Sequence, residues 1–268
     1  MDWIEALILG LVQGLTEFLP VSSSGHLIIG KELLGVHVNP DAETTFEVLV
    51  HCATVLSTIF VFKDEIWKLL QGFFKFQMNE ETHYILKICI SMIPVLIVGL
   101  FFKEEVKDVF GDGAVILTGG MLIITAILLS LTHFIKFKYR REMSYLDAFI
   151  IGISQAIAVV PGLSRSGATI STGLLLGNRK EDIARFSFLM VLVPILGETF
   201  LNVVGGDFSP TVSGIPMSAL ITGFLAAFFS GLFACKVMIA LVKRSKLIYF
   251  AGYCALLGAM ALIWQLSV

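Results

Sequence analysis

The chain has 268 residues, of which 56% are hydrophobic and only 15% are charged, and its mean hydropathy is +0.88. Soluble domains contain about 25% charged residues, so this composition excludes an ordinary water-soluble protein. The formal net charge of −2 is uninformative by itself, because the distribution of charge matters more in a membrane protein. We therefore expect an integral membrane protein that contacts the lipid bilayer.

Two kinds of apolar segment follow one another along the chain. Residues 2–35 are apolar but are interrupted by Pro, Gly, Ser and a carboxylate, and three continuous apolar stretches follow near 46–62, 85–102 and 114–134. The order then recurs, with an interrupted segment at 145–177 and continuous stretches near 187–204, 215–235 and 247–266. A membrane-spanning helix needs about 20 apolar residues. The pattern predicts an all-α polytopic membrane protein, a single membrane domain with six spans.

The distribution of positive charge supports six spans. Lysine and arginine mark the cytoplasmic side of a membrane protein. With six spans, four basic clusters fall on one side: Lys63, Lys68 and Lys75; Lys136, Lys138, Arg140 and Arg141; Arg179, Lys180 and Arg185; Lys236, Lys243, Arg244 and Lys246. Segments 2–35 and 145–177 must then each enter and leave on the same face. This predicts two re-entrant helical hairpins, whose non-helical backbone requires protein or a polar cavity around it.

The two interrupted segments resemble each other at a constant offset of 142 residues. The matched pairs are Glu5 with Asp147, Gly10 with Gly152, Gln13 with Gln155, Ser22 with Ser164, and Gly25 with Gly167. Three spans follow each segment, and an odd number reverses the direction of the next unit. We expect two inverted repeats, 1–134 and 145–268, whose hairpins enter from outside and from the cytoplasm and meet near the midplane. The alternative is two unrelated proline-broken helices.

The second hairpin contains an arginine within apolar sequence. An arginine inside a membrane costs at least about 2.5–3.5 kcal/mol on insertion scales, so Arg165 needs a partner or a ligand. One reading is a structural salt bridge with Glu17. The other is phosphate binding, because a Ser- and Gly-rich turn before a helix offers N–H and O–H donors to an anion. The expected phosphate-binding residues are Ser164, Arg165, Ser166, Gly167 and Thr169, with Ser22, Ser24 and Gly25 in the similar first turn.

The first hairpin supplies a carboxylate and an imidazole. Gln13 and Glu17 are spaced i, i+4 and so share one helix face. Oxygen ligands from these two residues and a substrate phosphate would suit Mg²⁺ or Ca²⁺, which predicts a divalent cation as cofactor. His26 is a candidate general acid or nucleophile toward phosphorus. Glu198, within an apolar stretch, is a site candidate without an assigned role.

Two longer motifs make the function more specific. The segments QGLTEFLPVSSSGHL and PGLSRSGATI resemble the signature motifs of the undecaprenyl-diphosphate phosphatase family, the bacitracin-resistance proteins of bacterial inner membranes. On this chain the motifs fall on Gln13 and Glu17, on Ser22, Ser23, Gly25 and His26, and on Ser164, Arg165, Ser166, Gly167 and Thr169. The resemblance implies hydrolysis of undecaprenyl diphosphate to the monophosphate and inorganic phosphate, which recycles the carrier of cell-wall synthesis.

The resemblance also implies a location and roles. The expected catalytic residues are Glu17, His26, Arg165 and Ser23, with His26 and Ser23 as alternative nucleophiles. We expect a multi-pass protein of the bacterial inner membrane whose site opens to the periplasmic side. The expected partners are a polyprenyl diphosphate lipid and the bilayer, with a homodimer as an option and no nucleic acid. Inverted repeats with broken helices also occur in secondary transporters, so transport or flipping of an anionic or lipid-phosphate substrate is the alternative function.

Overall fold

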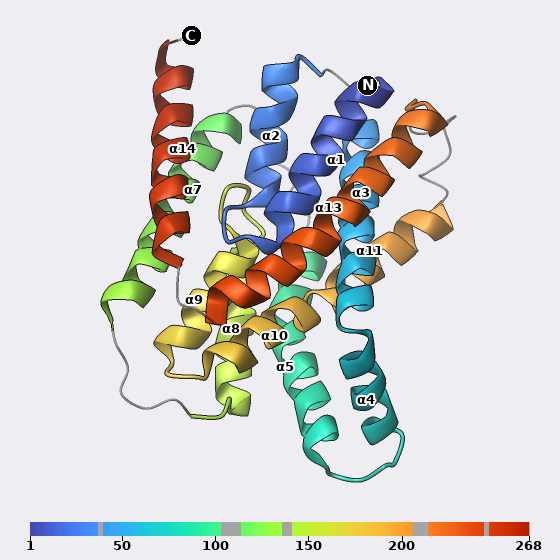
Figure 1. The fold of residues 1–268 in the computed structure, drawn as a ribbon, viewed down its shortest axis with the longest axis vertical. Helices are drawn as coiled ribbons and strands as arrows, with labels where there is room; N and C mark the ends of the chain where they lie inside the picture. The colour runs from blue at the N-terminus through green and yellow to red at the C-terminus, as the bar shows by residue number, and fades with distance from the viewer. Residues whose placement is uncertain (37–39, 103–113, 136–140, 206–213, 244–246, 268) are drawn as a thin grey trace.

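The computed structural model describes residues 1–36, 40–102, 114–135, 141–205, 214–243 and 247–267 (Figure 1). Regular structure in these ranges is helical, and the only pairing of extended backbone described is an isolated bridge between Arg141 and Asn178. The first half contains α1 (Trp3–Phe18), α2 (Ser23–Leu34), α3 (Pro40–Val61), α4 (Lys63–Phe73), α5 (Glu80–Phe101) and α7 (Ala114–Phe134). The second half contains α8 (Tyr145–Ile157), α9 (Arg165–Leu175), α10 (Lys180–Met190), α11 (Leu192–Gly205), α13 (Met217–Lys243) and α14 (Leu247–Ser267).

Six helical segments are long and apolar enough to cross a membrane, which confirms the six apolar spans predicted from the sequence. They are Thr44–Val61, Glu80–Phe101, Val115–Phe134, Lys180–Gly205, Met217–Val242 and Leu247–Gln265. Five residues of the basic clusters lie outside the described residues: Lys136, Lys138, Arg140, Arg244 and Lys246.

The fourth segment differs from the continuous stretch that hydropathy predicts at 187–204. The helical segment begins earlier, at Lys180, and is interrupted at Val191 between α10 and α11. Pro194 stands in the first turn of α11 and has no N–H with which to continue the hydrogen-bond ladder back to Met190. The chain therefore ends one helix and starts another within this apolar segment.

The outward faces of these helices are apolar. Only 17% of the span Glu80–Phe101 is buried inside the protein, and Leu96, Leu100 and Phe101 are among its exposed side chains. Contiguous exposure of this kind would be unfavourable in water but matches a surface that contacts lipid tails. The spans thus turn large apolar side chains outward, while polar side chains such as Gln13, Ser91 and Thr118 are buried inside the bundle.

Small residues allow helices inside the bundle to approach until their backbones touch. Such close packing matters in a membrane, because the hydrophobic effect does not drive helices together in lipid. A Cβ atom on Gly10 of α1 would lie 2.4 Å from the carbonyl oxygen of Gly223 in α13. A Cβ atom on Gly152 of α8 would lie 2.3 Å from the carbonyl oxygen of Ser91 in α5. The two glycines are 142 residues apart, so each interrupted segment packs against a long helix at the same relative position.

Helix caps also agree at this offset. Asp2 caps α1 and Ser144 caps α8, and each forms a reciprocal capping box with the acidic residue three positions later. Ser22 caps α2 and Ser164 caps α9, and each hydroxyl accepts a hydrogen bond from a glycine N–H three positions later. The matched caps therefore make the same hydrogen bonds in both halves, although the backbone differs at Ser22, with a φ of +66°, and Ser164, with a φ of −68°.

The close approach at Gly152 gives a stability prediction. Gly152→Ala forces a methyl group against a backbone carbonyl and is expected to cost about 1–3 kcal/mol, as overpacking does elsewhere. Gly120→Ala, in α7, is a matched control because no atom lies within 4 Å of its Cβ position. Thermal unfolding in detergent should show a lower midpoint for Gly152→Ala and an unchanged or higher one for Gly120→Ala, since Ala is the better helix former. Equal midpoints would contradict the contact.

Candidate functional site

The first helix break, between α1 and α2, holds its serines in a specific geometry. Pro20 follows the extended C-cap Leu19, and Ser22 has a φ of +66°, a left-handed conformation that is rare for residues other than glycine. The Ser22 hydroxyl accepts a hydrogen bond from the Gly25 N–H at 3.2 Å. This capping bond helps to fix the turn and makes Ser23 the first residue of α2.

The second break, between α8 and α9, depends on glycine. Gly162 has a φ of +88°, and a Cβ atom there would lie 2.4 Å from the carbonyl oxygen of Thr118 in α7. Ser164 then caps α9 by accepting a hydrogen bond from Gly167 N–H at 3.1 Å. As a result Arg165 is the first residue of α9, as Ser23 is of α2.

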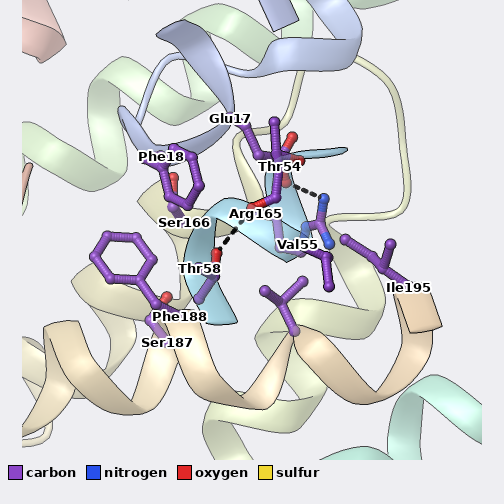
Figure 2. A pocket seen from close by; sticks show the side chains of 11 residues that line it. Glu17, Phe18, Thr54, Val55, Thr58, Arg165, Ser166, Ser187, Phe188 and Ile195 are labelled. Carbon is purple, nitrogen blue, oxygen red and sulfur yellow. Dashed lines mark hydrogen bonds and ion pairs between the residues drawn. The ribbon is translucent and has the colours of Figure 1, made fainter. Parts of the chain in front are cut away.

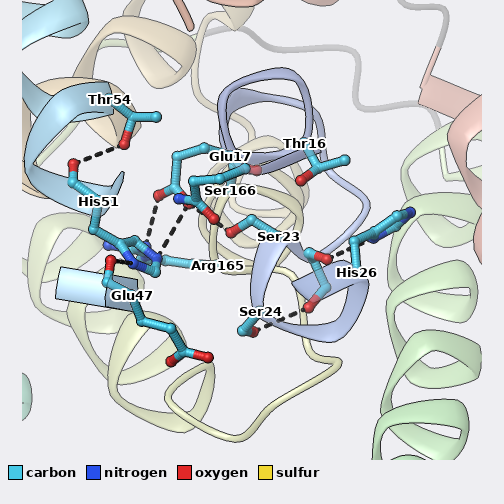
Figure 3. A network of polar contacts seen from close by, with 12 residues as sticks. Thr16, Glu17, Ser23, Ser24, His26, Glu47, His51, Thr54, Arg165 and Ser166 are labelled. Atoms are coloured by element: carbon cyan, nitrogen blue, oxygen red, sulfur yellow. Dashed lines mark hydrogen bonds and ion pairs between the residues drawn. The ribbon is translucent and has the colours of Figure 1, made fainter. Parts of the chain in front are cut away.

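The two breaks are in direct contact (Figure 3). Arg165 Nη2 lies 2.7 Å from Glu17 Oε1, which joins residues 148 positions apart, and Ser166 Oγ donates to the carbonyl oxygen of Leu19 at 3.2 Å. The N-termini of α2 and α9 therefore converge on one carboxylate. Helix N-termini carry partial positive charge and N–H donors, so the place where two of them meet favours an anion.

Glu17 is the centre of the polar cluster. Its second oxygen, Oε2, accepts hydrogen bonds from Ser23 Oγ at 2.5 Å and from Gln13 Nε2 at 2.8 Å. The side chain is 8% exposed, so these contacts and Arg165 replace the water that the carboxylate would otherwise bind. The structure thus brings together four predicted residues: Gln13, Glu17, Ser23 and Arg165.

A histidine that the sequence analysis did not assign to the site also faces Glu17. His51 Nε2 lies 3.5 Å from Glu17 Oε2, and its Nδ1 is 2.8 Å from the carbonyl oxygen of Glu47, one turn earlier in α3. The Glu47 side chain binds Lys31 of α2 at 2.7 Å. The sequence signal was an imidazole inside an apolar span, but spacing within α3 gives no information about its partner in α1.

His26 lies apart from this cluster. Its Nδ1 is 2.7 Å from the carbonyl oxygen of Ser22, its Nε2 is 2.7 Å from the hydroxyl of Tyr253 in α14, and the two rings are stacked. In Figure 3 the imidazole points away from Glu17 and Arg165, with Ser23 between them. The imidazole therefore contacts the strained turn rather than the carboxylate.

The other predicted residues lie in the two turns. Thr169 is buried, and its hydroxyl contacts Arg165 O at 2.9 Å and Ser187 Oγ at 2.6 Å. The Ser24 hydroxyl lies 3.4 Å from that of Ser22, and Ser166 and Ser164 are related in the same way. Glu198, in α11, is exposed.

A small pocket is lined in part by Glu17 and Arg165 (Figure 2). Its walls combine buried hydroxyl groups with apolar side chains from α3, α10 and α11. The lining residues are Glu17, Phe18, Thr54, Val55, Thr58, Arg165, Ser166, Ser187, Phe188, Val191 and Ile195. The ion pair therefore borders a small, mainly apolar pocket that also has hydroxyl groups in its wall.

The residues around Glu17 fit a hard divalent cation in part. Gln13 is fully buried, and its Oε1 has no hydrogen-bond partner in the described structure, so an acceptor oxygen stands beside the carboxylate without a donor. Mg²⁺ and Ca²⁺ prefer such oxygens. Within the described residues, three or more His, Cys, Asp or Glu side chains do not gather at one point. A cation here would need ligands from elsewhere, such as a phosphate.

Together, the fold and the site define a class: a polytopic helical membrane protein with a serine, a carboxylate and an arginine at the contact of two helix breaks. Comparison with known sequences then gives the family. The profile described as bacitracin resistance protein BacA matches residues 6–260, and the chain belongs to this family.

Curated relatives cover the whole chain. A protein of Bacteroides fragilis is 54% identical over 264 residues, 98% of either chain, and one of Bacteroides thetaiotaomicron is 54% identical over 270 residues, 99% of this chain and 100% of the relative. A more distant protein, from Carboxydothermus hydrogenoformans, is 36% identical and covers 99% of this chain and 98% of its own. All three are named undecaprenyl-diphosphatase.

The buried ion pair gives a second stability prediction. Arg165→Leu leaves Glu17 buried without its counter-charge, which is expected to cost about 3–5 kcal/mol. Adding Glu17→Gln to that variant removes the unpaired charge and should restore most of the lost stability. Arg179→Leu is the control, because its partner Glu142 is 79% exposed and surface pairs contribute little. Thermal unfolding in detergent measures all three, and a double variant no more stable than Arg165→Leu would argue against the pair.

Proposed function

We propose that this protein hydrolyses undecaprenyl diphosphate to undecaprenyl phosphate and inorganic phosphate, which recycles the lipid carrier of peptidoglycan synthesis and gives resistance to bacitracin. The observation that carries the proposal is the meeting of Ser23, Glu17 and Arg165 at two helix N-termini within an apolar bundle. Phosphoryl transfer depends chiefly on positioning and charge stabilisation, and these groups supply both. The names of the relatives agree with this activity.

In the proposed mechanism the diphosphate replaces Glu17 as the partner of Arg165. The guanidinium binds phosphate oxygens in bidentate geometry, and the first turns of α2 and α9 add N–H donors. Ser22 and Ser164 hold these turns through their capping bonds, while Thr169 supports the first turn of α9 through the Arg165 carbonyl. The phosphate-binding residues thus divide into those that contact the anion and those that shape the turns.

Ser23 is the proposed nucleophile. Its hydroxyl donates to Glu17, whereas His26 is engaged by Ser22 and Tyr253. Ser23 Oγ attacks the terminal phosphorus, the bond from that phosphorus to the bridging oxygen breaks, and the serine proton passes through Glu17 to the departing undecaprenyl phosphate. Water then attacks the phosphoserine: its hydroxyl bonds to phosphorus, the bond from phosphorus to Ser23 Oγ breaks, its proton passes to Ser23 Oγ, and inorganic phosphate leaves. His26 acts by holding the Ser22 turn.

We propose that Glu17 and Gln13 hold a divalent cation, Mg²⁺ or Ca²⁺, together with the substrate phosphates. The unpartnered Oε1 of Gln13 supports this assignment. A bound cation would neutralise phosphate charge and polarise a phosphorus–oxygen bond. The role of Gln13 is to orient Glu17 through its Nε2 and to offer Oε1 as a ligand.

We further propose the membrane arrangement. The α1–α2 and α8–α9 segments are re-entrant hairpins of two inverted repeats, 1–134 and 145–268, and the first opens to the periplasmic side of the bacterial inner membrane. The matched caps and glycine contacts support the repeat. The apolar outer surface would admit the lipid tail sideways while its head group reaches the tips. A homodimer of such units stays a prediction.

The nucleophile can be identified chemically. We expect quenched reactions with a terminally ³²P-labelled undecaprenyl diphosphate to leave acid-stable label on Ser23, and Ser23→Ala to lose both label and turnover. His26→Gln should retain measurable label, because it removes a turn contact and not the nucleophile. Acid-labile label, lost in His26→Gln and kept in Ser23→Ala, would instead identify His26.

The function itself is tested by phosphate release. Purified protein in detergent should release inorganic phosphate from undecaprenyl diphosphate, and Arg165→Lys should lower the rate by about 10²-fold or more, because an ammonium cannot bind phosphate bidentately. Arg179→Lys, on the same protein, should retain the normal rate. Absence of release by the unmodified protein, together with uptake of an anion into vesicles containing it, would favour transport.

A further inference from the structure

The position of His51 relative to Glu17 is not that of a hydrogen-bonded pair. The 3.5 Å from His51 Nε2 to Glu17 Oε2 exceeds the roughly 2.7–3.2 Å of an N–H···O hydrogen bond. Two ligand atoms, each about 2.1 Å from the same ion, lie about 3.0–3.4 Å apart at octahedral to tetrahedral angles. The observed spacing is therefore close to that of two atoms that share a cation.

A hydrogen bond at Nδ1 fixes the orientation of the His51 imidazole. Nδ1 donates to the Glu47 carbonyl at 2.8 Å, which leaves Nε2 as the nitrogen that faces Glu17. Histidine ligands almost always donate their other ring N–H to a carbonyl or carboxylate in this way, which holds the ring in the ligating tautomer. The Lys31–Glu47 ion pair, at 2.7 Å, ties the same turn of α3 to α2. The ring is thus held as a ligand would be.

Oxygen atoms complete the surroundings. Gln13 Oε1, buried and without a hydrogen-bond partner, belongs to the amide that donates to Glu17 Oε2, and Ser23 Oγ contacts the same carboxylate oxygen. We propose that His51 is a nitrogen ligand of the divalent cation at Glu17. The site is then a mixed nitrogen and oxygen site in this chain. The inference rests on the proposed cation site and not on the identity of the lipid.

A nitrogen ligand changes the preference for metal ions. Imidazole suits first-row transition ions, and Ca²⁺ and Mg²⁺ prefer oxygen. Mn²⁺ suits carboxylate and carbonyl oxygens and lies at the weak end of the transition series. As a first-row transition ion it also binds imidazole nitrogen. The site should therefore bind Mn²⁺ more tightly than Ca²⁺, and the difference should depend on His51.

The test uses the full purified chain in detergent with Mn²⁺ alone. Electron paramagnetic resonance measures free Mn²⁺, and electron spin echo modulation detects a ¹⁴N nucleus bound to it. We expect ¹⁴N modulation in the unmodified protein, and in His51→Gln its loss together with Mn²⁺ binding weaker by about tenfold or more. Ca²⁺ affinity, measured by competition, should change much less. His133→Gln, a histidine at the exposed end of α7, is the matched control and should behave as unmodified.

The outcomes separate this inference from the proposed function. The assignment would be overturned if Mn²⁺ bound to the unmodified protein shows no ¹⁴N modulation, or if His51→Gln binds Mn²⁺ as tightly as the unmodified protein does. Either result would count even if the same preparation releases phosphate from undecaprenyl diphosphate. Absence of phosphate release with the expected Mn²⁺ behaviour would count against the function and leave the ligand in place. The thermal unfolding midpoint of His51→Gln, compared with that of the unmodified protein, checks that the variant is folded.

Discussion

The ion pair between Glu17 and Arg165 is the constraint on which the rest of the site depends. Each charge comes from a different helix break, 148 residues apart, and each would be costly in an apolar bundle without the other. The pair therefore requires the two breaks to remain in contact. The glycine contacts of α1 with α13 and of α8 with α5 set the distance at which this is achieved.

The same pair links substrate binding to proton transfer in the proposed reaction. While Glu17 is ionised, it competes with phosphate for Arg165. When Glu17 takes the proton of Ser23, it becomes neutral and its hold on Arg165 weakens, at the moment when the phosphate needs the guanidinium most. A single carboxylate can in this way serve as counter-charge in the resting protein and as base during reaction, because one of its oxygens contacts Arg165 and the other contacts Ser23.

Much of this site could be predicted from the sequence, because its residues stand in two short motifs where Pro, Gly and Ser interrupt apolar helices. Glu17 and Arg165 were predicted in this way and Ser23 from the resemblance to the family, and the structure brings the three together. The contributions of His51 and Tyr253 could not be predicted, since both come from long apolar helices whose own spacing does not reveal which side chain they face. The helix break at Val191 follows from Pro194, which a mean hydropathy over many residues does not reveal.

The two helix breaks use similar serine caps for different chemistry. At the offset of 142 residues Ser23 corresponds to Arg165, and each is the first residue of a helix capped by the serine before it. The position of Glu17 corresponds to Val159, so the second half has no carboxylate there. If both halves had a serine and a glutamate at these positions, two carboxylates would face each other without an arginine. If both halves had an arginine there, two guanidinium groups would face each other without a carboxylate. The difference at these two positions is what allows two similarly capped helix breaks to hold a charge-balanced site.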